Sequence, residues 1–469
     1  MAATSLAGGQ DILYYIVLHL AADLNNVPHG HYNELTDSKS ARQALARLAR
    51  VHSSFTRPAL AALWRFLWSD KALKHLLCVV GIAQRPPETR HNSWYRLCPV
   101  ELYGTPETRE SRWTRFQEYA CLVREIIIDP FVAAVDPNLR PKPQQDTFWY
   151  QLLSAFGNAP ILPRLEVATL LNAGSFLTFR DSLDTGPLCL LNPVIRELNI
   201  IFPYMSGRED ETTLRSVLSA CFSSRQNVEV LSLELPVRAL DIKSLPQSHP
   251  HLRHLELKLD YDYGPRIDPN HFTSLATLTT LESLSIDLSS QAPLNLPVTF
   301  TRLRNIAVSG YDFRAISALI ARVDAPQLRT FSITETHIYS NNIHQELPSY
   351  LRMLVAKCPS LMGFHWHSRQ IYLPRHGFGG ERRAGATLAE LIDPLLSLRT
   401  IRSFSARFWS PIVPYSSTDF RTIAEAWPEL ETFHLYDHED SAGDQYADLE
   451  SILSFARHCP HLRSLGIQK

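Results

Sequence analysis

Residues 328–333 read Leu328-Arg329-Thr330-Phe331-Ser332-Ile333, with apolar side chains at the first, fourth and sixth positions. The same spacing returns from the middle of the chain to its last residues. One such unit cannot bury its apolar side alone, so the recurrence predicts an array of stacked repeats with a continuous core. The other clear copies are Ile195-Leu198-Ile200, Val228-Leu231-Leu233, Leu252-Leu255-Leu257, Leu281-Leu284-Ile286, Leu303-Ile306-Val308, Leu361-Phe364-Trp366, Leu430-Phe433-Leu435 and Leu462-Leu465-Ile467.

The repeats differ in length, and weaker copies fill the long intervals. One weak copy, Ile401-Phe404-Ala406, falls in the wide interval before Leu430. Two more precede the clear copies, at Val123-Ile126-Ile128 and Leu165-Ala168-Leu170. We therefore expect an array of about a dozen irregular units over residues 123–469.

Helical patterns occupy many intervals between the predicted strands. Asp312 and Asp448 each precede a segment with apolar residues at helical spacing, which makes them candidate N-caps. A strand followed by a helix and a parallel strand is a right-handed crossover unit, and stacked units curve with strands inside and helices outside. The sequence thus predicts an α/β solenoid. Further helices are expected over 146–156, 210–222, 348–357, 387–398 and 419–427.

The repeat region resembles the leucine-rich-repeat family, in the variant with long units and helices on the convex side. The resemblance covers roughly residues 120–469. The asparagine that commonly follows the strand in that family is mostly missing here, so the expected arc is irregular with uneven loops.

Residues 1–70 carry helical patterns instead of the strand motif. A helix is expected from Asp11 to Ala22, followed by helical patterning from Ala41 to Trp68 that is broken at Pro58. A small helical domain is therefore expected to precede the array. Residues 71–122 are expected to form an irregular, proline-rich connection that ends in a helix from Arg112 to Arg124, leading into the first repeat.

Two short stretches of this helical region resemble the F-box found in many fungal F-box proteins with leucine-rich repeats. They are Val51-His52-Ser53-Ser54-Phe55 and Leu63-Trp64-Arg65-Phe66-Leu67. The Leu-Pro pair that usually opens an F-box is absent, and Ala7-Gly8-Gly9-Gln10 stands in its place.

The F-box resemblance implies a substrate-recognition subunit of an SCF-type cullin-RING ubiquitin ligase. The N-terminal helices would dock on a Skp-type adaptor, and the repeat arc would hold an unidentified protein substrate. The alternative is a non-ligase repeat scaffold in which these helices only cap the solenoid, with their apolar residues serving as the domain's own core. The residues expected at the adaptor contact are Ile12, Leu13, Ile16, Leu45, Leu48, Val51 and Phe55.

Composition argues against several other classes of protein. The 46 Lys and Arg balance 47 Asp and Glu, so no basic field favours nucleic acid as a partner. The apolar stretch from Ile12 to Ala22 is too short to span a membrane, and no basic region opens the chain. The 7 scattered cysteines fit reduced thiols, which places the protein in the cytoplasm, the nucleus or both. Cys358 and Cys459 are expected to be buried at the ends of helices.

Motifs for catalysis, cofactor binding or metal binding are missing from the sequence. There is no GxxxxGK[ST] phosphate loop, no HExxH helix and no GxSxG turn, and Gly377-Phe378-Gly379-Gly380 lacks the context of a phosphate cradle. The histidines His249, His251 and His254 have no cysteine or carboxylate at a matching spacing for zinc. We therefore expect a binding protein and no enzyme, with no cofactor and no metal.

The alternation of side chains along a strand predicts which residues line the concave surface. The apolar positions face the core, so the residues between and after the last two apolar positions face the opposite side. This surface is mostly small and polar, but near the C-terminus it is rich in the residue types that supply binding energy at interfaces. The candidate target-binding residues are His365, His367, Arg407, Trp409, His434 and Tyr436.

Overall fold

The structure is a computed structural model that describes residues 17, 35–67, 69–84, 96–97, 106–128, 148–155, 159–171, 186–202, 208–222, 227–235, 242–259, 269–288, 297–310, 313–338, 343–371, 386–408, 413–437 and 447–468. The chain folds into two compact units, residues 1–228 and 229–469. The boundary falls inside the predicted repeat array, and each unit is described here on its own.

Unit 1 begins with two helices that pack against each other, α2 (Leu35–Val51) and α3 (Ser53–Arg65). The break between them lies at His52, so the expected break at Pro58 is wrong. His52 has extended backbone, with φ −157° and ψ 149°, and its ring accepts a hydrogen bond from the Ser54 amide at 3.2 Å. Pro58 lies inside α3 and has no backbone N–H to donate to the preceding turn. The helix tolerates the loss of this one hydrogen bond and continues through the proline.

The helix pair has a small apolar core of its own, formed mainly by one side of α2 and one side of α3. Leu45 on α2 and Ala59 on α3 have no exposed surface. Val17, outside these helices, joins them and is 3% exposed. The partly buried residues around this core are Leu48, Ala49, Ala62 and Leu63.

The parallel sheet of unit 1 starts directly after α3. Phe66 and Leu67 form strand β1 (Phe66–Leu67), which pairs in parallel with β4 (Glu125–Ile128). The expected helix up to Trp68 is therefore wrong at its end, because Phe66 takes an extended conformation and Leu67 is fully buried. The sheet order in this unit is β1, β4, β5 (Val167–Leu171) and β6 (Glu197–Ile201).

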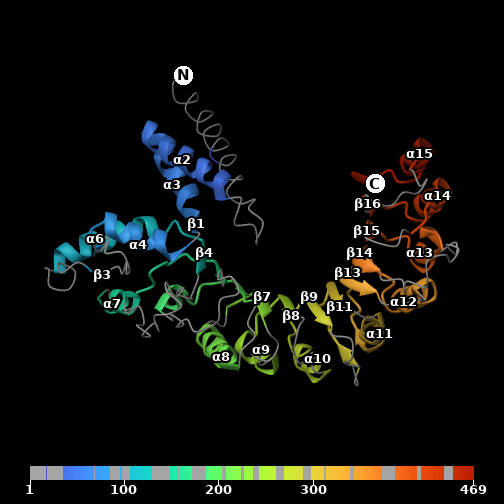
Figure 1. Ribbon diagram of the computed structural model, residues 1–469, viewed down its shortest axis with the longest axis horizontal. Helices are drawn as coiled ribbons and strands as arrows, with labels where there is room; N and C mark the ends of the chain where they lie inside the picture. Colours follow the sequence, from blue (N-terminus) through green and yellow to red (C-terminus); the bar gives the residue numbers. More distant parts are fainter. Residues whose placement is uncertain are drawn as a thin grey trace, which may run out of the picture. The chain divides into compact units, whose positions relative to one another are not determined.

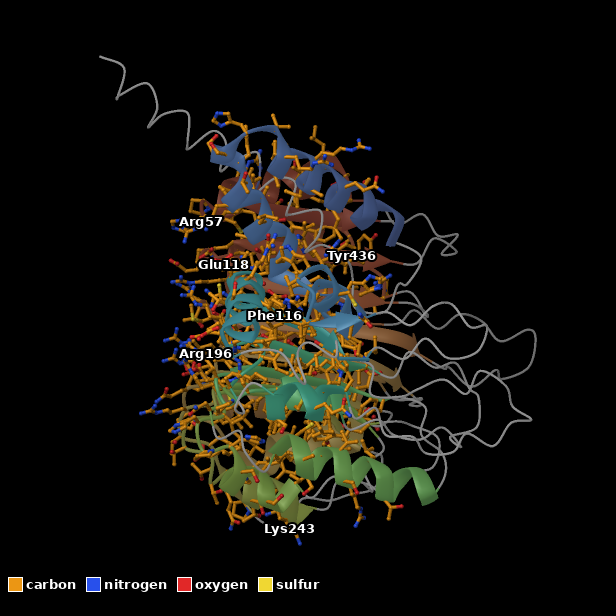
Figure 2. All side chains as sticks on the ribbon, turned by 90° about the vertical axis from the view of Figure 1, so that its left-hand side faces the viewer. Arg57, Phe116, Glu118, Arg196, Lys243 and Tyr436 are labelled. Carbon is orange, nitrogen blue, oxygen red and sulfur yellow. The ribbon has the colours of Figure 1, made fainter. Side chains whose placement is uncertain are left out.

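The two weak repeats predicted in unit 1 are confirmed, because their apolar positions line up in β4 and β5 and are buried. Phe116 on α6 is also buried, whereas Glu118 two residues later is exposed (Figure 2). The expected helix from Arg112 to Arg124 begins earlier and ends earlier, since β4 follows at once. The remaining elements are α4 (Asp70–Val79), β2 (Ala83–Gln84), β3 (Arg96–Leu97), α6 (Pro106–Ala120), α7 (Phe148–Ala155), η2 (Gly186–Leu190) and α8 (Arg208–Phe222).

Unit 2 is a continuous run of parallel strands with helices along one side (Figure 1). The strands of the main sheet follow each other in sequence order and lie on the inner side of the unit's curve, and β10 and β12 pair with each other in a separate two-stranded parallel sheet. The elements are β7 (Val230–Leu235), η4 (Ile242–Ser244), α9 (Leu245–Ser248), β8 (His254–Leu259), α10 (Pro269–Leu275), β9 (Ser283–Leu288), β10 (Val298–Thr299), β11 (Asn305–Gly310), α11 (Phe313–Arg322), β12 (Val323–Asp324), β13 (Thr330–Ile338), α12 (Ile343–Lys357), β14 (Gly363–Ile371), α13 (Leu388–Leu396), β15 (Ser403–Phe408), α14 (Ser417–Ala426), β16 (Thr432–Asp437), α15 (Leu449–His458) and β17 (Ser464–Gln468).

This architecture confirms the predicted α/β solenoid of leucine-rich-repeat type. The five helices expected in the intervals are present as α7, α8, α12, α13 and α14, with ends shifted by a few residues. The largest shift is in α12, which begins at Ile343 and contains Pro348 in its interior. The weak repeat at Ile401 supplies β15, whose neighbours are β14 and β16.

The register of the strands stacks the motif's apolar residues into columns. Phe331, Phe364, Phe404 and Phe433 are successive partners across β13 to β16. Their ring centroids are 6.4, 6.3 and 5.4 Å apart, and the rings are nearly parallel. Because all four are buried, this aromatic column carries much of the hydrophobic stabilisation of the C-terminal repeats.

A column of backbone hydrogen bonds runs along the edge of the sheet where the strands begin. The carbonyl of the second motif residue accepts two backbone N–H groups from the next repeat. Arg253 accepts from Glu282 and Ser283 at 2.8 and 3.0 Å, and Arg329 accepts from Met362 and Gly363 at 2.7 and 2.9 Å. These paired bonds fix each strand against its neighbour before the regular ladder begins.

Side chains at the same motif position form ion pairs between repeats. Arg253 Nη2 lies 2.8 Å from Glu282 Oε1, and Arg402 Nη1 lies 3.6 Å from Glu431 Oε1. Arg463 in the last repeat reaches the other oxygen of Glu431 at 3.7 Å. These pairs are exposed, so they add register specificity more than stability.

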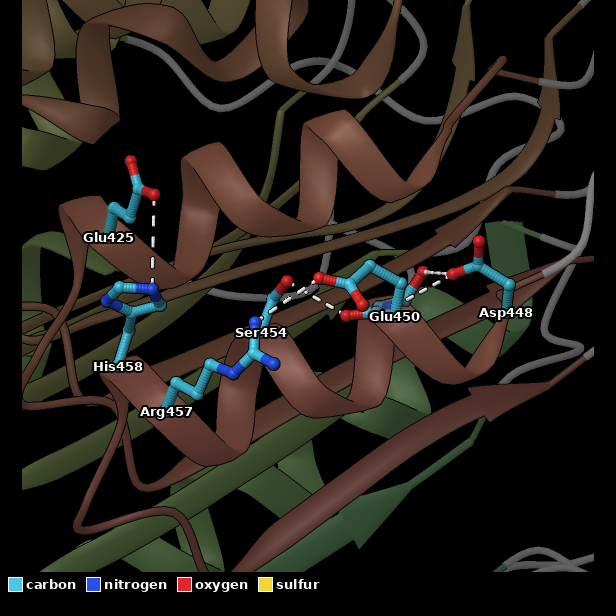
Figure 3. Close-up of polar contacts among 7 residues, drawn as sticks. Glu425, Asp448, Glu450, Ser454, Arg457 and His458 are labelled. Atoms are coloured by element: carbon cyan, nitrogen blue, oxygen red, sulfur yellow. Dashed lines mark hydrogen bonds and ion pairs between the residues drawn. The ribbon is translucent and has the colours of Figure 1, made fainter.

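Side-chain caps define where several convex helices begin. Asp448 accepts hydrogen bonds from the Ser451 amide and hydroxyl at 2.8 and 2.7 Å, which confirms it as the N-cap of α15 (Figure 3). These hydrogen bonds lower the pKa of Asp448. Asp312, the other expected cap, lies outside the described residues.

Asp419 joins the first turns of two neighbouring helices. Its Oδ2 accepts from the Ser416 amide and hydroxyl at the start of α14, at 2.8 and 2.6 Å. Its Oδ1 accepts from the Thr387 hydroxyl and the Ala389 amide at the start of α13, at 2.6 and 3.2 Å. Asp419 is 5% exposed, so one buried carboxylate links two repeats.

Cys358 and Cys459 are buried directly after α12 and α15, as expected. Burial raises the pKa of each thiol to about 11. Both therefore stay protonated at neutral pH and serve as small apolar residues.

Replacing Phe404 by Ala tests the aromatic column. The ring also lies 5.2 Å from that of Trp427, so its removal leaves a cavity between three repeats. We expect a loss of about 3–5 kcal/mol in the free energy of unfolding, measured by urea denaturation. A loss below about 1 kcal/mol would show that the column does not hold the repeats together.

Replacing Asp419 by Asn tests the link between α13 and α14. Asparagine keeps only one acceptor oxygen, so the buried donors of either Ser416 or the Thr387–Ala389 turn lose their partner. We expect a loss of about 1–3 kcal/mol in the free energy of unfolding. Asp393 is exposed on α13, so the matched change Asp393→Asn should leave the urea midpoint unchanged.

Candidate protein-binding surface

The concave side of unit 2 carries the side chains that alternate with the buried motif residues. On β14, Phe364 and Trp366 have no exposed surface, whereas His365 and His367 are only partly buried. The same alternation holds on β16, where Phe433 is buried and its neighbours are not. The predicted sorting of side chains into core and concave rows is therefore confirmed on these two strands, whereas Ser405 on β15 and Asp287 on β9, both predicted for the concave rows, are buried.

Strand register brings five of the candidate residues together. His365 pairs with Ser405, which in turn pairs with His434, so the two histidines lie in one row across β14 to β16. In the next row His367 pairs with Arg407, and Arg407 pairs with Tyr436. We call the set His365, His367, Arg407, His434 and Tyr436 the C-terminal concave patch.

Contacts within the patch hold His434 in place. Its ring lies edge-on to Tyr436, with centroids 5.7 Å apart, and its Nε2 lies 2.8 Å from the Ser464 hydroxyl oxygen. Gly466 lies opposite His434 on β17, where a Cβ atom would come 2.9 Å from the ring Cδ2. The ring therefore occupies space that only a glycine leaves open.

Two histidines of the patch, His365 and His367, are held towards their neutral form. Burial lowers the pKa of His365, and the nearby charges of His367 and His434 lower it further. Burial also lowers the pKa of His367, with Arg407 as the second cause. Each ring is thus uncharged at neutral pH and gains charge only in acidic solution.

The remaining candidate residues from the sequence differ in burial, and several lie outside the described residues. Trp409 lies outside the described residues, as do Ile12, Leu13 and Ile16. Among the helical candidates, Leu45 is fully buried in the core of the helix pair. Val51 is 71% exposed at the end of α2. The two partly buried candidates are Leu48 and Phe55.

Sequence reasoning missed the residues that support the patch. Gly466 is the position that makes room for the His434 ring, Ser464 is the hydrogen-bond partner of that ring, and Gly363 lies against Thr330 and His365. Both glycines fall in concave rows of the motif, and this position is the only signal that the sequence offers for them. Larger polar residues are equally compatible with the pattern there, so the motif alone does not single the glycines out. Their importance became visible only with the strand register.

Within the part of the chain that the structure describes, no group of three or more His, Cys, Asp or Glu side chains lies together as metal ligands would. His249 is buried next to α9, whereas His251 and His254 are exposed. None of the described helices is both long and apolar enough to cross a bilayer.

Comparisons with known proteins add a fold-level similarity. No protein-family model and no curated protein matches the chain. Among solved structures, the crystal structure of the leucine-rich repeat-containing protein LegL7 from Legionella pneumophila is similar, with a TM-score of 0.37 and 12% sequence identity. The match covers 74% of this chain and 91% of that one. The repeat fold itself rests on the strand order and register described above.

Replacing Gly466 by Ala tests how His434 is held. The added methyl group would meet the ring, so we expect the ring to turn away from Ser464. The histidine side-chain NMR signals of His434 should shift, while those of His254 on β8 stay in place. Unchanged His434 signals would show that the ring does not depend on the glycine.

Proposed function

We propose that this protein works by binding other proteins, with its concave repeat surface holding a target. Within that function, we propose that it is the substrate-recognition subunit of an SCF-type cullin-RING ligase. The chain would perform no chemistry of its own, and would raise the effective concentration of its target near an enzyme on another subunit. A cytoplasmic or nuclear location belongs to the same proposal.

The observation that carries the target-binding proposal is the C-terminal concave patch. It places an arginine, a tyrosine and three histidines side by side on adjacent rigid strands. Aromatic residues and arginine supply much of the energy at protein interfaces. The strands also hold these side chains in fixed rows, which lowers the entropy lost on binding.

The adaptor-docking proposal is supported by one exposed apolar side chain at the junction of α2 and α3. Val51 is 71% exposed, and Phe55 in the first turn of α3 is partly buried. The Thr56 hydroxyl donates to the Ala49 carbonyl at 2.9 Å and fixes the junction. An exposed valine on a fixed turn fits docking onto a helical adaptor.

A second candidate function is a repeat scaffold in which α2 and α3 only cap the solenoid. It is favoured by the direct passage from α3 into β1, which pairs with β4. The backbone amide of Arg124, just before β4, also donates to the Arg65 carbonyl at 2.9 Å. A cap must make such contacts, whereas a docking domain on a flexible tether need not.

A point substitution separates the two candidates better than removal of residues 1–70, since that deletion would destroy β1. Val51→Glu places a charge where the adaptor would bury an apolar side chain. Val51 is largely exposed, so the stability should change by no more than about 0.5 kcal/mol. We expect affinity for a purified Skp-type adaptor to fall at least about tenfold, measured by isothermal titration calorimetry.

The matched control is Val79→Glu on α4, where the valine is 79% exposed. This variant should bind the adaptor as the unmodified protein does. Equal adaptor binding by Val51→Glu and the unmodified protein would remove Val51 from the contact. A complete lack of binding by the unmodified protein would refute the ligase proposal and favour the scaffold.

A further inference from the structure

The second residue of the repeat motif follows a charge pattern along the chain. Arginine and glutamate alternate through the early repeats, and they alternate again over the last three. In chain order these residues are Arg124, Glu166, Arg196, Glu229, Arg253, Glu282, Arg304, Arg329, Met362, Arg402, Glu431 and Arg463. The alternation is interrupted in the middle of unit 2, where two arginines follow each other and a methionine comes next.

Ion pairs in unit 2 show what the alternation does. Arg253 lies between the carboxylates of both neighbouring repeats, with Nη2 2.8 Å from Glu282 Oε1 and Nη1 3.9 Å from Glu229 Oε2. In the last repeats, Glu431 is shared by the arginines on either side of it. A glutamate beside each arginine is therefore the usual arrangement where the strands begin.

Arg329 lacks this arrangement. Its amide donates to the Arg304 carbonyl at 2.7 Å, and its carbonyl accepts from the Met362 amide at 2.7 Å, so its neighbours along this edge are an arginine and a methionine. Arg304 and Arg329 are both exposed, as is Arg302 two residues before Arg304. Among the described residues, no carboxylate forms an ion pair with any of these three arginines. We call the three the arginine edge.

The carboxylates around the arginine edge are too few to neutralise it. Glu282 is engaged by Arg253, and that hydrogen bond is the main reason why the pKa of Glu282 is lowered. The segments where this part of the sheet begins, 297–304, 323–329 and 357–362, contain one carboxylate, Asp324 on β12. Residues 289–296, which precede them in the chain, contain no charged residue.

Asp324 also has a lysine near it. Burial raises the pKa of the Cys358 thiol, and the charges of Lys357 and Asp324 act on the same thiol in opposite directions. The Lys357 ammonium group is fixed there, because it donates to the carbonyls of Ala321 and Val323 at 2.6 and 3.2 Å. The charge of this aspartate is thus offset locally, and the arginine edge keeps its positive charge.

We propose that the arginine edge is a docking site for an acidic segment of a partner protein. Carboxylates of that segment take the place that glutamate occupies beside the arginines of other repeats. The proposal rests on the proposed function only in that the partner is a protein, and its surface is separate from the C-terminal concave patch.

The repeats themselves indicate the chemistry of the partner. The contact of Arg253 with Glu282 shows that a carboxylate fits between neighbouring repeats at this motif position. Like charges on adjacent strands destabilise a sheet, so a carboxylate beside Arg304 and Arg329 relieves their repulsion. Arginine also binds carboxylates well, because its planar guanidinium group can donate two parallel hydrogen bonds.

The flanking glutamates limit the length of the bound segment. Glu282 on one side and Glu431 on the other are separated by the strands β11, β13, β14 and β15. At about 4.8 Å per strand they are about 24 Å apart along the edge, which is the length of about seven extended residues. A nucleic acid needs several phosphate contacts and would continue past both glutamates, so a short acidic peptide fits better.

The test uses the full-length protein and a fluorescein-labelled octaglutamate peptide, whose fluorescence anisotropy is titrated at neutral pH. We expect the affinity to fall at least about threefold when sodium chloride is raised from about 50 to about 300 mM, because salt screens exposed charges. A labelled octaserine peptide should not bind.

Paired variants locate the site. The double variant Arg304→Gln with Arg329→Gln should weaken binding about threefold to tenfold at low salt, as expected for two exposed charge pairs. The matched control is Arg124→Gln with Arg463→Gln. It removes the same charge from the same motif position in repeats that have a glutamate neighbour, and it should bind as the unmodified protein does.

A third variant restores the alternation. Arg329→Glu places a carboxylate beside Arg304, so it should abolish binding of octaglutamate. It should also raise the urea midpoint, because an opposite-charge pair replaces a like-charge pair. Urea unfolding of every variant shows whether each one is folded.

Several outcomes would overturn the proposal. They are no binding of octaglutamate at low salt, equal weakening by the test and control pairs, undiminished binding by Arg329→Glu, or a lowered urea midpoint for that variant. Binding of a labelled DNA oligonucleotide but not of the peptide would assign the edge to nucleic acid. Adaptor binding is measured separately with Val51→Glu, so a failure here with an intact adaptor contact removes only this docking site.

Discussion

The paired backbone bonds at the start of each strand are the constraint on which the rest of the structure depends. One carbonyl, such as that of Arg253 or Arg402, accepts two N–H groups from the following repeat. A slip of one residue would break both bonds and turn every apolar motif residue towards solvent. The register over the motif residues is therefore the same from repeat to repeat even though the loops differ in length, and it shifts beyond Thr334 in the pairing of β13 with β14.

A constant register is also what creates the binding surface. Residues at the same motif position fall into straight rows, so single side chains from separate repeats become neighbours without any local sequence signal. His365 and His434 are far apart in the chain and share a row because β15 lies between their strands. Gly466 then decides whether the row has room for a ring. The binding surface of such a fold is therefore formed by residues from several repeats, at motif positions that do not face the core.

Much of this architecture was predictable from the sequence because the motif reports burial at three positions in six. Even the weak copies at Val123, Leu165 and Ile401 were recognised, and each supplies a strand. Strand β1 was missed because two residues, Phe66 and Leu67, carry no periodicity. The helix break lies at His52, the N-cap of α3, and not at the predicted Pro58, because α3 accommodates a proline in its interior. The concave rows followed from alternation, but their glycine supports required the register.

The N-terminal helices can both cap the solenoid and dock a partner, because the two roles use different residues. Capping depends on the passage from α3 into β1 and on the backbone bond to Arg65. The inner side of the helix pair is occupied by its own core around Leu45. Val51 belongs to neither set and remains exposed at the far end of α2. A partner that binds there would gain apolar burial without disturbing the cap, so the helix pair can present a docking surface while its position on the first repeat is held by the sheet.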